Sequence, residues 1–176
     1  MSLKVIGRIN TGLDDLYAWC ELQLLKHEVK STYALHRLEK WYRAGSNLRS
    51  GDAEKVFRTD EPKRRIVKLG DRLLPGWHSE LVCSGDRHSG TSTTISNHRD
   101  HTHFQGHAIL INLGEAIYRE QLRRNDDSSW QEYKLTDGIV VSINTKLIHS
   151  AEQISTERYN LTFRHFKPEY LQLLQH

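Results

Sequence analysis

Apolar positions near the start of the chain recur every three to four residues, which is the spacing of an amphipathic helix. Thr11 is a suitable N-cap, acidic residues follow it in the first turn, and the apolar positions are Leu13, Leu16, Tyr17, Cys20 and Leu24. A second run predicts another helix that stops near Gly45, with apolar positions Leu35, Leu38, Trp41 and Tyr42. We therefore expect residues 1–45 to be mostly helical.

Beyond residue 45 the pattern changes to short runs with strand character, separated by turn signals such as Pro75-Gly76 and Asp137-Gly138. The predicted strands are 65–69, 80–84, 91–96, 107–113, 138–143 and 159–163. Short strands behind a helical start indicate an α+β, mainly β protein, built as a β-sandwich or jelly roll with buttressing N-terminal helices. We expect one domain over residues 1–176, with its β core at 65–166.

Composition narrows the class of protein. With 176 residues, 37% apolar and 27% charged, the chain suits one water-soluble domain, and no stretch is apolar enough to span a membrane. Its first residues lack the apolar centre of a secretory signal, so we expect a cytoplasmic protein, and we expect a monomer. Cys20 and Cys83 are far apart and not in CxxC spacing, which favours small core residues in a reducing compartment.

The formal net charge of +3 is mild, but seven basic residues fall within a short stretch. They are Lys55, Arg58, Lys63, Arg64, Arg65, Lys68 and Arg72. They could form a strip that tracks nucleic-acid phosphates, or a solvated face interrupted by Asp60, Glu61 and Asp71. The sequence leaves both interpretations open.

Four histidines and an aspartate crowd the stretch SNHRDHTHFQGH at 96–107. If residues 95–100 are extended, His98 and Asp100 project from the same face, because strand side chains repeat every two residues. Together they supply two of the three ligands of a 2-His-1-carboxylate site, which leaves positions open on Fe(II). His149 follows the predicted strand 138–143, and a neighbouring strand could bring it beside the pair.

The stretch RYNLTFR at 158–164 divides its side chains between two faces with the same period of two. Tyr159, Leu161 and Phe163 form an apolar face, and the polar face consists of Arg158, Asn160, Thr162 and Arg164. Arginines on the inner face of a sheet are costly to bury unless an anion pairs with them. Since a guanidinium can grip a carboxylate with two hydrogen bonds, this strand favours a small acid, such as a dicarboxylate, as its ligand.

HRD at 98–100, His149 and RYNLTFR together resemble the AlkB group of Fe(II)/2-oxoglutarate dioxygenases, whose pattern is HxD, a distant His, then RxNxTxR. The resemblance covers residues 95–166 and implies a double-stranded β-helix. By this resemblance His98, Asp100 and His149 would bind Fe(II), Arg158 would pair with the distal carboxylate of 2-oxoglutarate, and Arg164 would lie near its metal-side carboxylate. Asn160 and Thr162 would support that site.

The implied reaction uses O2, converts 2-oxoglutarate to succinate and oxidises a substrate C–H bond; an N-methyl group would be lost as formaldehyde. The implied partner is alkylated, single-stranded nucleic acid. Two features depart from the family: residues 84–97 lack the aromatic that usually touches 2-oxoglutarate, and Thr102 stands where the dealkylases tend to carry an acid. Any lid over a flipped base would have to come from residues 46–78.

Three alternatives stay open. The same chemistry could hydroxylate a protein side chain or a small molecule, the fold could bind without catalysis, or a zinc- or nucleic-acid-binding module could be built on His98, His101, His103 and His107. Three of these histidines, His101, His103 and His107, could instead surround the iron. Phe104, Trp77 and Trp130 could stack on a substrate ring or pack in the core.

Overall fold

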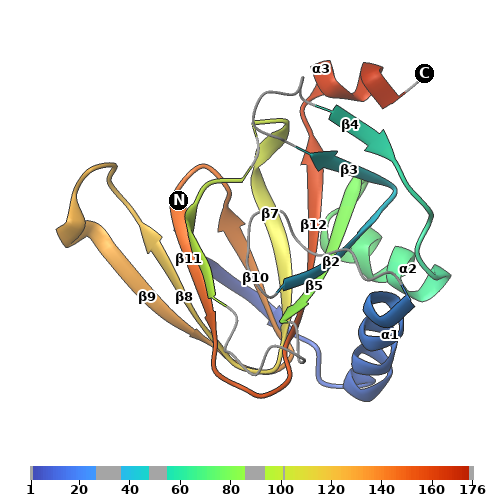
Figure 1. Ribbon diagram of the computed structural model, residues 1–176, viewed down its shortest axis with the longest axis horizontal. Helices are drawn as coiled ribbons and strands as arrows, with labels where there is room; N and C mark the ends of the chain where they lie inside the picture. Colours follow the sequence, from blue (N-terminus) through green and yellow to red (C-terminus); the bar gives the residue numbers. More distant parts are fainter. Residues whose placement is uncertain (1, 27–36, 48–54, 86–93, 101, 175–176) are drawn as a thin grey trace.

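The computed structural model describes residues 2–26, 37–47, 55–85, 94–100 and 102–174. Its strands form a six-stranded sheet, a four-stranded sheet and a two-stranded pair, and every pairing within them is antiparallel (Figure 1). The six-stranded sheet, called here the major sheet, has the order β1 (Lys4–Arg8), β10 (Ile139–Asn144), β7 (Phe104–Leu113), β12 (Tyr159–Phe166), β5 (Ser79–Gly85) and β2 (Arg37–Tyr42).

The four-stranded sheet, called here the minor sheet, has the order β6 (Thr94–His98), β11 (Ile148–Gln153), β8 (Ala116–Gln121) and β9 (Trp130–Leu135). From β7 to β12 the chain passes back and forth between the sheets, since β7, β10 and β12 belong to the major sheet and β8, β9 and β11 to the minor one. This alternation is the jelly-roll arrangement that the sequence predicted. The β8–β9 hairpin, with the short turn η2 (Asp127–Ser129), projects from one end of the molecule (Figure 1).

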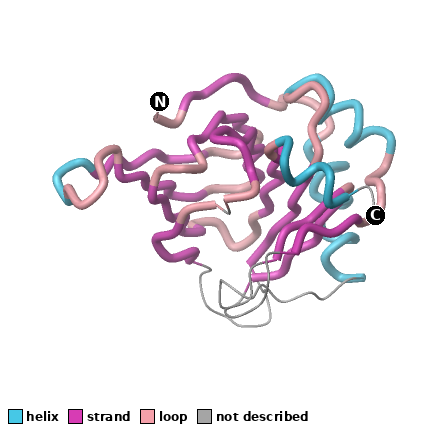
Figure 2. Tube along the Cα trace, turned by 90° about the horizontal axis from the view of Figure 1, so that it is seen from above, coloured by secondary structure: helices cyan, strands magenta, loops and turns pink. Residues whose placement is uncertain are grey.

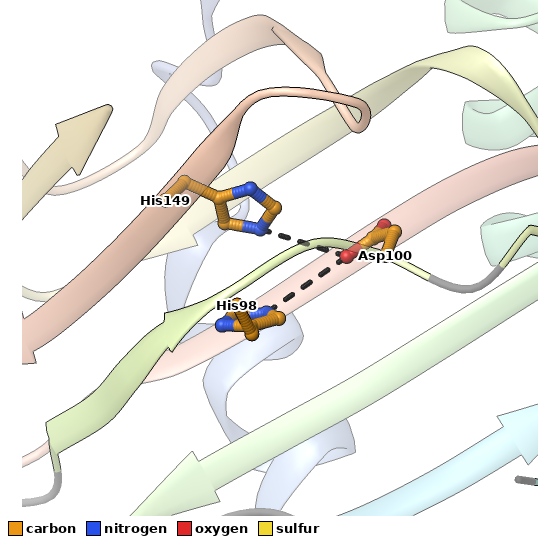
Figure 3. A group of neighbouring side chains, drawn as sticks. All are labelled: His98, Asp100 and His149. Carbon is orange, nitrogen blue, oxygen red and sulfur yellow. Dashed lines mark ion pairs between the residues drawn. The ribbon is translucent and has the colours of Figure 1, made fainter. Parts of the chain in front are cut away.

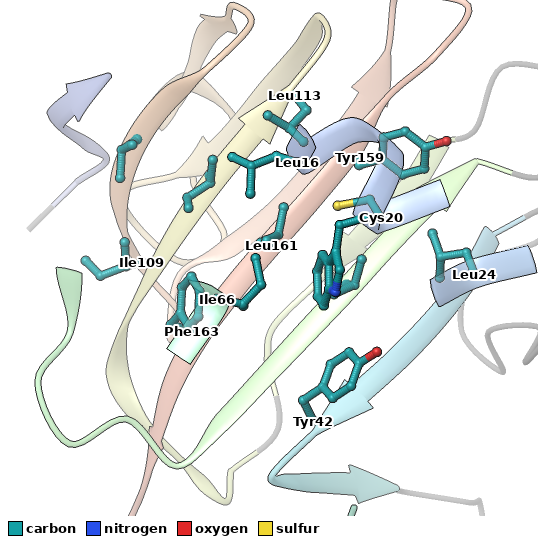
Figure 4. Packing of buried hydrophobic residues seen from close by; sticks show 14 of the residues in the cluster. Leu16, Cys20, Leu24, Tyr42, Ile66, Ile109, Leu113, Tyr159, Leu161 and Phe163 are labelled. Carbon is teal, nitrogen blue, oxygen red and sulfur yellow. The ribbon is translucent and has the colours of Figure 1, made fainter. Parts of the chain in front are cut away.

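Two helices, α1 (Leu13–Lys26) and α2 (Arg64–Leu73), pack on the outer face of the major sheet. The apolar cluster between them and the sheet includes Leu16, Cys20 and Leu24 of α1, Ile66 of α2, Ile109, Ile111 and Leu113 of β7, and Tyr159, Leu161 and Phe163 of β12 (Figure 4). Seen from above, most of the helical turns gather in one half of the molecule, away from the projecting hairpin (Figure 2). The outer face of β12 is therefore the apolar one, as the period of two predicted.

A second apolar cluster fills the space between the two sheets. It contains Leu110 of β7, Val141 of β10, Tyr118 of β8 and Leu135 of β9. The two-stranded pair, β3 (Ala44–Asn47) and β4 (Lys55–Arg58), lies beside the C-terminal turns α3 (Pro168–Leu171) and η3 (Gln172–Leu174). None of the helices among the described residues has the length and apolar character needed to span a bilayer.

Two predicted elements are wrong. Residues 37–42 form strand β2 and not a helix, and the described residues of 1–45 also contain β1 and the start of β3 beside the helix α1. Leu35 of the predicted second helix lies outside the described residues. The strand buries side chains on both faces, with Leu38 and Tyr42 toward the helices and Trp41 on the other face, and this hides the period of two.

Residues 65–69 belong to helix α2 and not to a strand, because apolar positions at helical spacing extend from Ile66 to Leu73. The first helix and the strands at 80–84, 107–113, 138–143 and 159–163 are confirmed. Of the predicted strand 91–96, residues 91–93 lie outside the described part of the chain. Cys20 and Cys83 are buried free thiols, as expected for core positions.

Candidate metal and co-substrate site

Three side chains chosen from the sequence converge at the edge of the minor sheet (Figure 3). His98 at the end of β6 and His149 on β11 are direct partners across the two strands, and Asp100 follows β6 by two residues. One ligand atom from each of the three lies within 4.8 Å of the other two. Oδ1 of Asp100 is 3.5 Å from Nε2 of His149 and 3.9 Å from Nε2 of His98.

Backbone carbonyls fix the orientation of both imidazoles. Nδ1 of His98 lies 2.8 Å from the carbonyl oxygen of Ser96, and Nδ1 of His149 lies 3.0 Å from that of Leu147. A carbonyl oxygen can only accept, so each Nδ1 carries a proton and Nε2 is the ring nitrogen turned toward Asp100. The two rings are therefore oriented so that Nε2 of each would be the metal ligand.

Arg164 holds the Asp100 carboxylate in its ionised form. Nε of Arg164 donates to Oδ2 of Asp100 at 2.9 Å, and both side chains are buried. Burial alone would raise the pKa of Asp100, but the charge and hydrogen bond of Arg164 together with the neighbouring His149 outweigh burial and hold that pKa well below its usual range. Burial, and then the neighbouring His149, lower the pKa of His98. The donor set is thus two imidazole nitrogens and one carboxylate oxygen.

The site is more open on the His98 side. The His98 side chain is 36% exposed, whereas those of His149 and Asp100 are 6% and 9% exposed. Since β6 is an edge strand and β11 an inner strand, this difference follows from the sheet order. A substrate approaching the three side chains would therefore reach them from the β6 side.

The polar face of β12 points into the space between the sheets, as the sequence predicted. Arg158 is buried, and its Nε donates to Oδ1 of Asn112 on β7 at 2.9 Å. Among the described residues, its Nη2 has no hydrogen-bond partner and its guanidinium forms no ion pair with an acid. Burial lowers its pKa to about 10, so it stays charged at neutral pH. Such a cation favours an anionic ligand.

Asn160 and Thr162 lie between the two arginines on the same inner face of β12. Both are buried, and Asn160 is in register with Asn112 of β7 and Cys83 of β5. Because direct partners in an antiparallel pair share a face, Cys83 also faces the inner side. Arg158, which directly precedes β12, and the three polar residues Asn160, Thr162 and Arg164 of β12 therefore form one continuous row, with Arg164 at the metal end and Arg158 at the other.

The sequence did not single out Arg37, Trp41 or Tyr118. Arg37 and Trp41 lie on the inner face of β2, a strand that the sequence pattern wrongly predicted as a helix. The Arg164 guanidinium lies 5.9 Å from the Trp41 ring centre. Tyr118 on β8 stacks on His149, with ring centres 5.7 Å apart and planes 23° from parallel. The alternation of AIYREQ at 116–121 was the available signal for Tyr118.

Of the other aromatic candidates, Trp77 and Trp130 lie away from this site and Phe104 borders it. Trp77 is 1% exposed in the outer cluster, and Trp130 lies on β9, at the opposite edge of the minor sheet from His98. Phe104 is buried against Phe166, and its ring centre lies 5.3 Å from the Arg164 guanidinium. These positions fit the packing interpretation.

Among the described residues, His98, His103 and His107 do not form a cluster of the kind that a zinc module would need. His103 is buried with Nδ1 2.5 Å from Oγ of Ser46, His107 is exposed on β7, and His101 lies outside the described residues. Within the described part of the chain, His98 instead groups with Asp100 and His149.

The predicted basic strip divides between β4 and α2. Arg58 donates to the carbonyl of Leu174, Arg65 pairs with Asp15, and the side chain of Lys55 lies outside the described part. Four exposed cations of α2 and its N-cap make no ion pair with a described residue: Lys63, Arg64, Lys68 and Arg72. They lie on the far side of the major sheet from His98.

No family model and no curated protein sequence matches this chain. Solved structures do match. OsALKBH1, an AlkB homologue, superposes with a TM-score of 0.66 at 12% identity, over 93% of this chain and 98% of that one. AviO1 from Streptomyces viridochromogenes Tue57 matches with a TM-score of 0.54 at 11% identity, over 95% and 90% of the two chains. EvdMO1 matches with a TM-score of 0.56 at 12% identity, over 95% of this chain and 47% of its own. The AlkB-like fold that the sequence motifs predicted is therefore confirmed, and these likenesses establish the fold alone.

Proposed function

We propose that this protein is an Fe(II)- and 2-oxoglutarate-dependent dioxygenase that oxidises a C–H bond of a second substrate. The observation that carries the proposal is the grouping of His98, Asp100 and His149 within 4.8 Å, beside a buried Arg158 that lacks an acidic partner among the described residues. Two imidazoles and one carboxylate fit Fe(II), because they leave coordination positions for a co-substrate and oxygen. The unpaired guanidinium fits the distal carboxylate of 2-oxoglutarate.

Each residue has a role that follows from its place in the fold. His98 and His149 would bind through Nε2, and Asp100 through Oδ1 while Arg164 holds Oδ2. Arg158 would fix the far end of the co-substrate, and the buried Asn160 and Thr162 would lie along it and exclude water. Bound Fe(II) supplies the oxygen chemistry that couples decarboxylation of 2-oxoglutarate to C–H oxidation.

For the second substrate we propose alkylated single-stranded nucleic acid, which would lose its methyl group as formaldehyde. The AlkB-like fold supports this choice. Hydroxylation of a protein side chain or a small molecule is the second candidate, favoured by the exposed Thr102 in place of an acid beyond Asp100. That the chain is one domain, monomeric and cytoplasmic stays a prediction from the sequence.

The test is succinate formation from 2-oxoglutarate with Fe(II) and ascorbate, with and without methylated single-stranded DNA or RNA, while formaldehyde is measured in parallel. We expect turnover in the wild type and none in Asp100→Ala, which removes one ligand. Stimulation by nucleic acid with matching formaldehyde would support the dealkylase. Turnover that is the same with and without nucleic acid would support the dioxygenase activity but favour hydroxylation of a protein side chain or a small molecule. Equal turnover in Asp100→Ala and the wild type would refute the metal site.

A further inference from the structure

The Tyr118 hydroxyl is buried next to the candidate metal site without a hydrogen-bond partner. Tyr118 is 2% exposed, and no described residue accepts from or donates to its hydroxyl. Glu120, two residues along the same face of β8, accepts instead from the backbone N–H of Leu3 and the hydroxyl of Tyr133. Buried hydroxyls are rarely left unpaired, since the loss of hydration is costly, so a ligand is the natural partner.

Three further buried donors on the inner face share this condition. Nη2 of Arg158, Nη1 of Arg164 and Nε of Arg37 also lack a hydrogen-bond partner among the described residues. Tyr118 comes from β8, Arg37 from β2, and Arg158 and Arg164 from the two ends of the polar row, so the four groups lie on elements of both sheets that face the space between them. Three are cationic donors and the fourth is a neutral hydroxyl, which together match a ligand rich in acceptor oxygens and negative charge.

The position of Tyr118 indicates which end of such a ligand it would meet. Its ring stacks on the metal-ligand candidate His149, and Tyr118 is in register with Ala151, two residues further along β11. Arg164, which is bonded to Asp100, lies at the same metal end of the site, whereas Arg158 lies six residues away along β12. Tyr118 therefore lies at the metal end of the site.

We propose that the Tyr118 hydroxyl donates a hydrogen bond to the metal-side carboxylate of 2-oxoglutarate, which it shares with Nη1 of Arg164, while Arg158 takes the distal carboxylate. This inference rests on the proposed function. It assigns a co-substrate contact to β8, although residues 84–97 before His98 contain no aromatic. The stacked ring also covers the face of His149, so that the hydroxyl and the ring act on the same end of the site.

The experiment measures equilibrium binding by calorimetry without oxygen, using Mn(II)-loaded protein and two acids, 2-oxoglutarate and pyruvate. Pyruvate keeps the metal-side carboxylate and the keto oxygen but lacks the distal carboxylate. Tyr118→Phe removes only the hydroxyl and keeps the ring on His149. Tyr133→Phe is the matched control, because its hydroxyl bonds to Glu120 and Gln131, and its ring centre lies 6.4 Å from that of Tyr118.

We expect Tyr118→Phe to weaken both acids by roughly tenfold or more, as for loss of a hydrogen bond to a charged group. Arg158→Gln should weaken 2-oxoglutarate alone, and Tyr133→Phe should change neither acid. Mn(II) affinity should be the same in Tyr118→Phe and the wild type.

Unchanged binding in Tyr118→Phe would overturn the assignment, and so would a loss restricted to 2-oxoglutarate, which would place the hydroxyl at the distal end. An equal loss of Mn(II) affinity would show that the phenol acts only through His149. If the wild type binds Mn(II) but not 2-oxoglutarate, the proposed function itself fails, and that result differs from all of the others.

Discussion

Nε of Arg164 donates to Oδ2 of Asp100 at 2.9 Å, so the two oxygens of this carboxylate have separate tasks. Oδ2 is held by the guanidinium, and Oδ1 faces both candidate histidine ligands. A group that orients a metal ligand typically contributes ten- to a hundredfold to metal affinity. The pair therefore connects the last polar residue of the β12 row to the metal site.

We expect Arg164→Met to lower the affinity for Fe(II) or Mn(II) by about 10–100-fold, because Asp100 loses its orienting donor and part of its charge stabilisation. Titration of the metal-free protein measures this loss. The matched control is Arg119→Met, which removes an exposed arginine that pairs with Glu132 and Glu152. Equal metal affinity in the two variants would contradict the role given to Arg164.

Arg158→Gln should raise the 2-oxoglutarate concentration needed for half-maximal succinate formation by about tenfold or more, since a charge-assisted hydrogen bond is lost. Metal affinity should not change, because Arg158 bonds to Asn112 and not to Asp100. Arg65→Gln, at an exposed arginine paired with Asp15, serves as the control. An unchanged 2-oxoglutarate requirement would remove Arg158 from the co-substrate site.

Glu80 should make the protein less stable as the pH rises. It is fully buried in the outer face of β5, its carboxylate oxygens have no partner among the described residues, and burial raises its pKa well above the ordinary 4.5. The protonated form fits the fold, so its stability contribution is complete below pH 4.5 and is lost as the pH rises through the raised pKa.

We expect Glu80→Met to increase the free energy of unfolding by about 1–3 kcal/mol at pH 8, and by less at pH 5, because the buried carboxyl is gone. Urea unfolding at both pH values measures the difference. Glu132→Gln also removes an ionisable carboxyl, but an exposed one, and should leave the pH dependence of the free energy of unfolding unchanged. A Glu80→Met variant that is less stable than the wild type at pH 8 would count against a protonated Glu80.

Gly114 lies in the turn between β7 and β8 with φ +85°, and a Cβ there would lie 2.4 Å from the carbonyl oxygen of Glu157 and 3.3 Å from Cα of Arg158. Gly76 has a similar φ of +71° but open space around it. We expect Gly76→Ala to cost about 1–2 kcal/mol of stability from backbone strain alone.

Gly114→Ala should cost more and should also weaken 2-oxoglutarate binding, because the backbone of Glu157 and Arg158 must move. Thermal unfolding of the two variants measures the stability lost to backbone strain. Calorimetric titration with 2-oxoglutarate measures the effect of displacing the backbone at Glu157 and Arg158. If both substitutions leave co-substrate binding equally intact, the turn does not position Arg158.

The β12 strand and the His98–Asp100 pair could be predicted because both obey a simple period of two. One face of β12 is buried against helices and the other is polar, so the alternation in RYNLTFR indicates which side chains lie on each face of the sheet. Asp100 lies just beyond the strand end, yet it stays close to His98 because the chain continues in the same direction. In these segments local pattern and tertiary environment agree.

Other parts of the site could not be read from pattern. β2 has buried side chains on both faces, so its apolar spacing imitated a helix and concealed Arg37 and Trp41. The pairing of Arg164 with Asp100 depends on the packing of the two sheets and has no local signal. Tyr118 was in an unassigned segment, and its contact with His149 arises only when β8 pairs with β11.

The direct pairing of His98 with His149 across β6 and β11 also bears on when the metal site can exist. Strands β7 to β10 lie between the two histidines in the chain, so closing this contact carries the entropy cost of a long loop. During synthesis His98 and Asp100 leave the ribosome well before His149, and the pair alone is an incomplete set of ligands. The complete set of three is therefore a late product of folding, formed only after the minor sheet has joined β11.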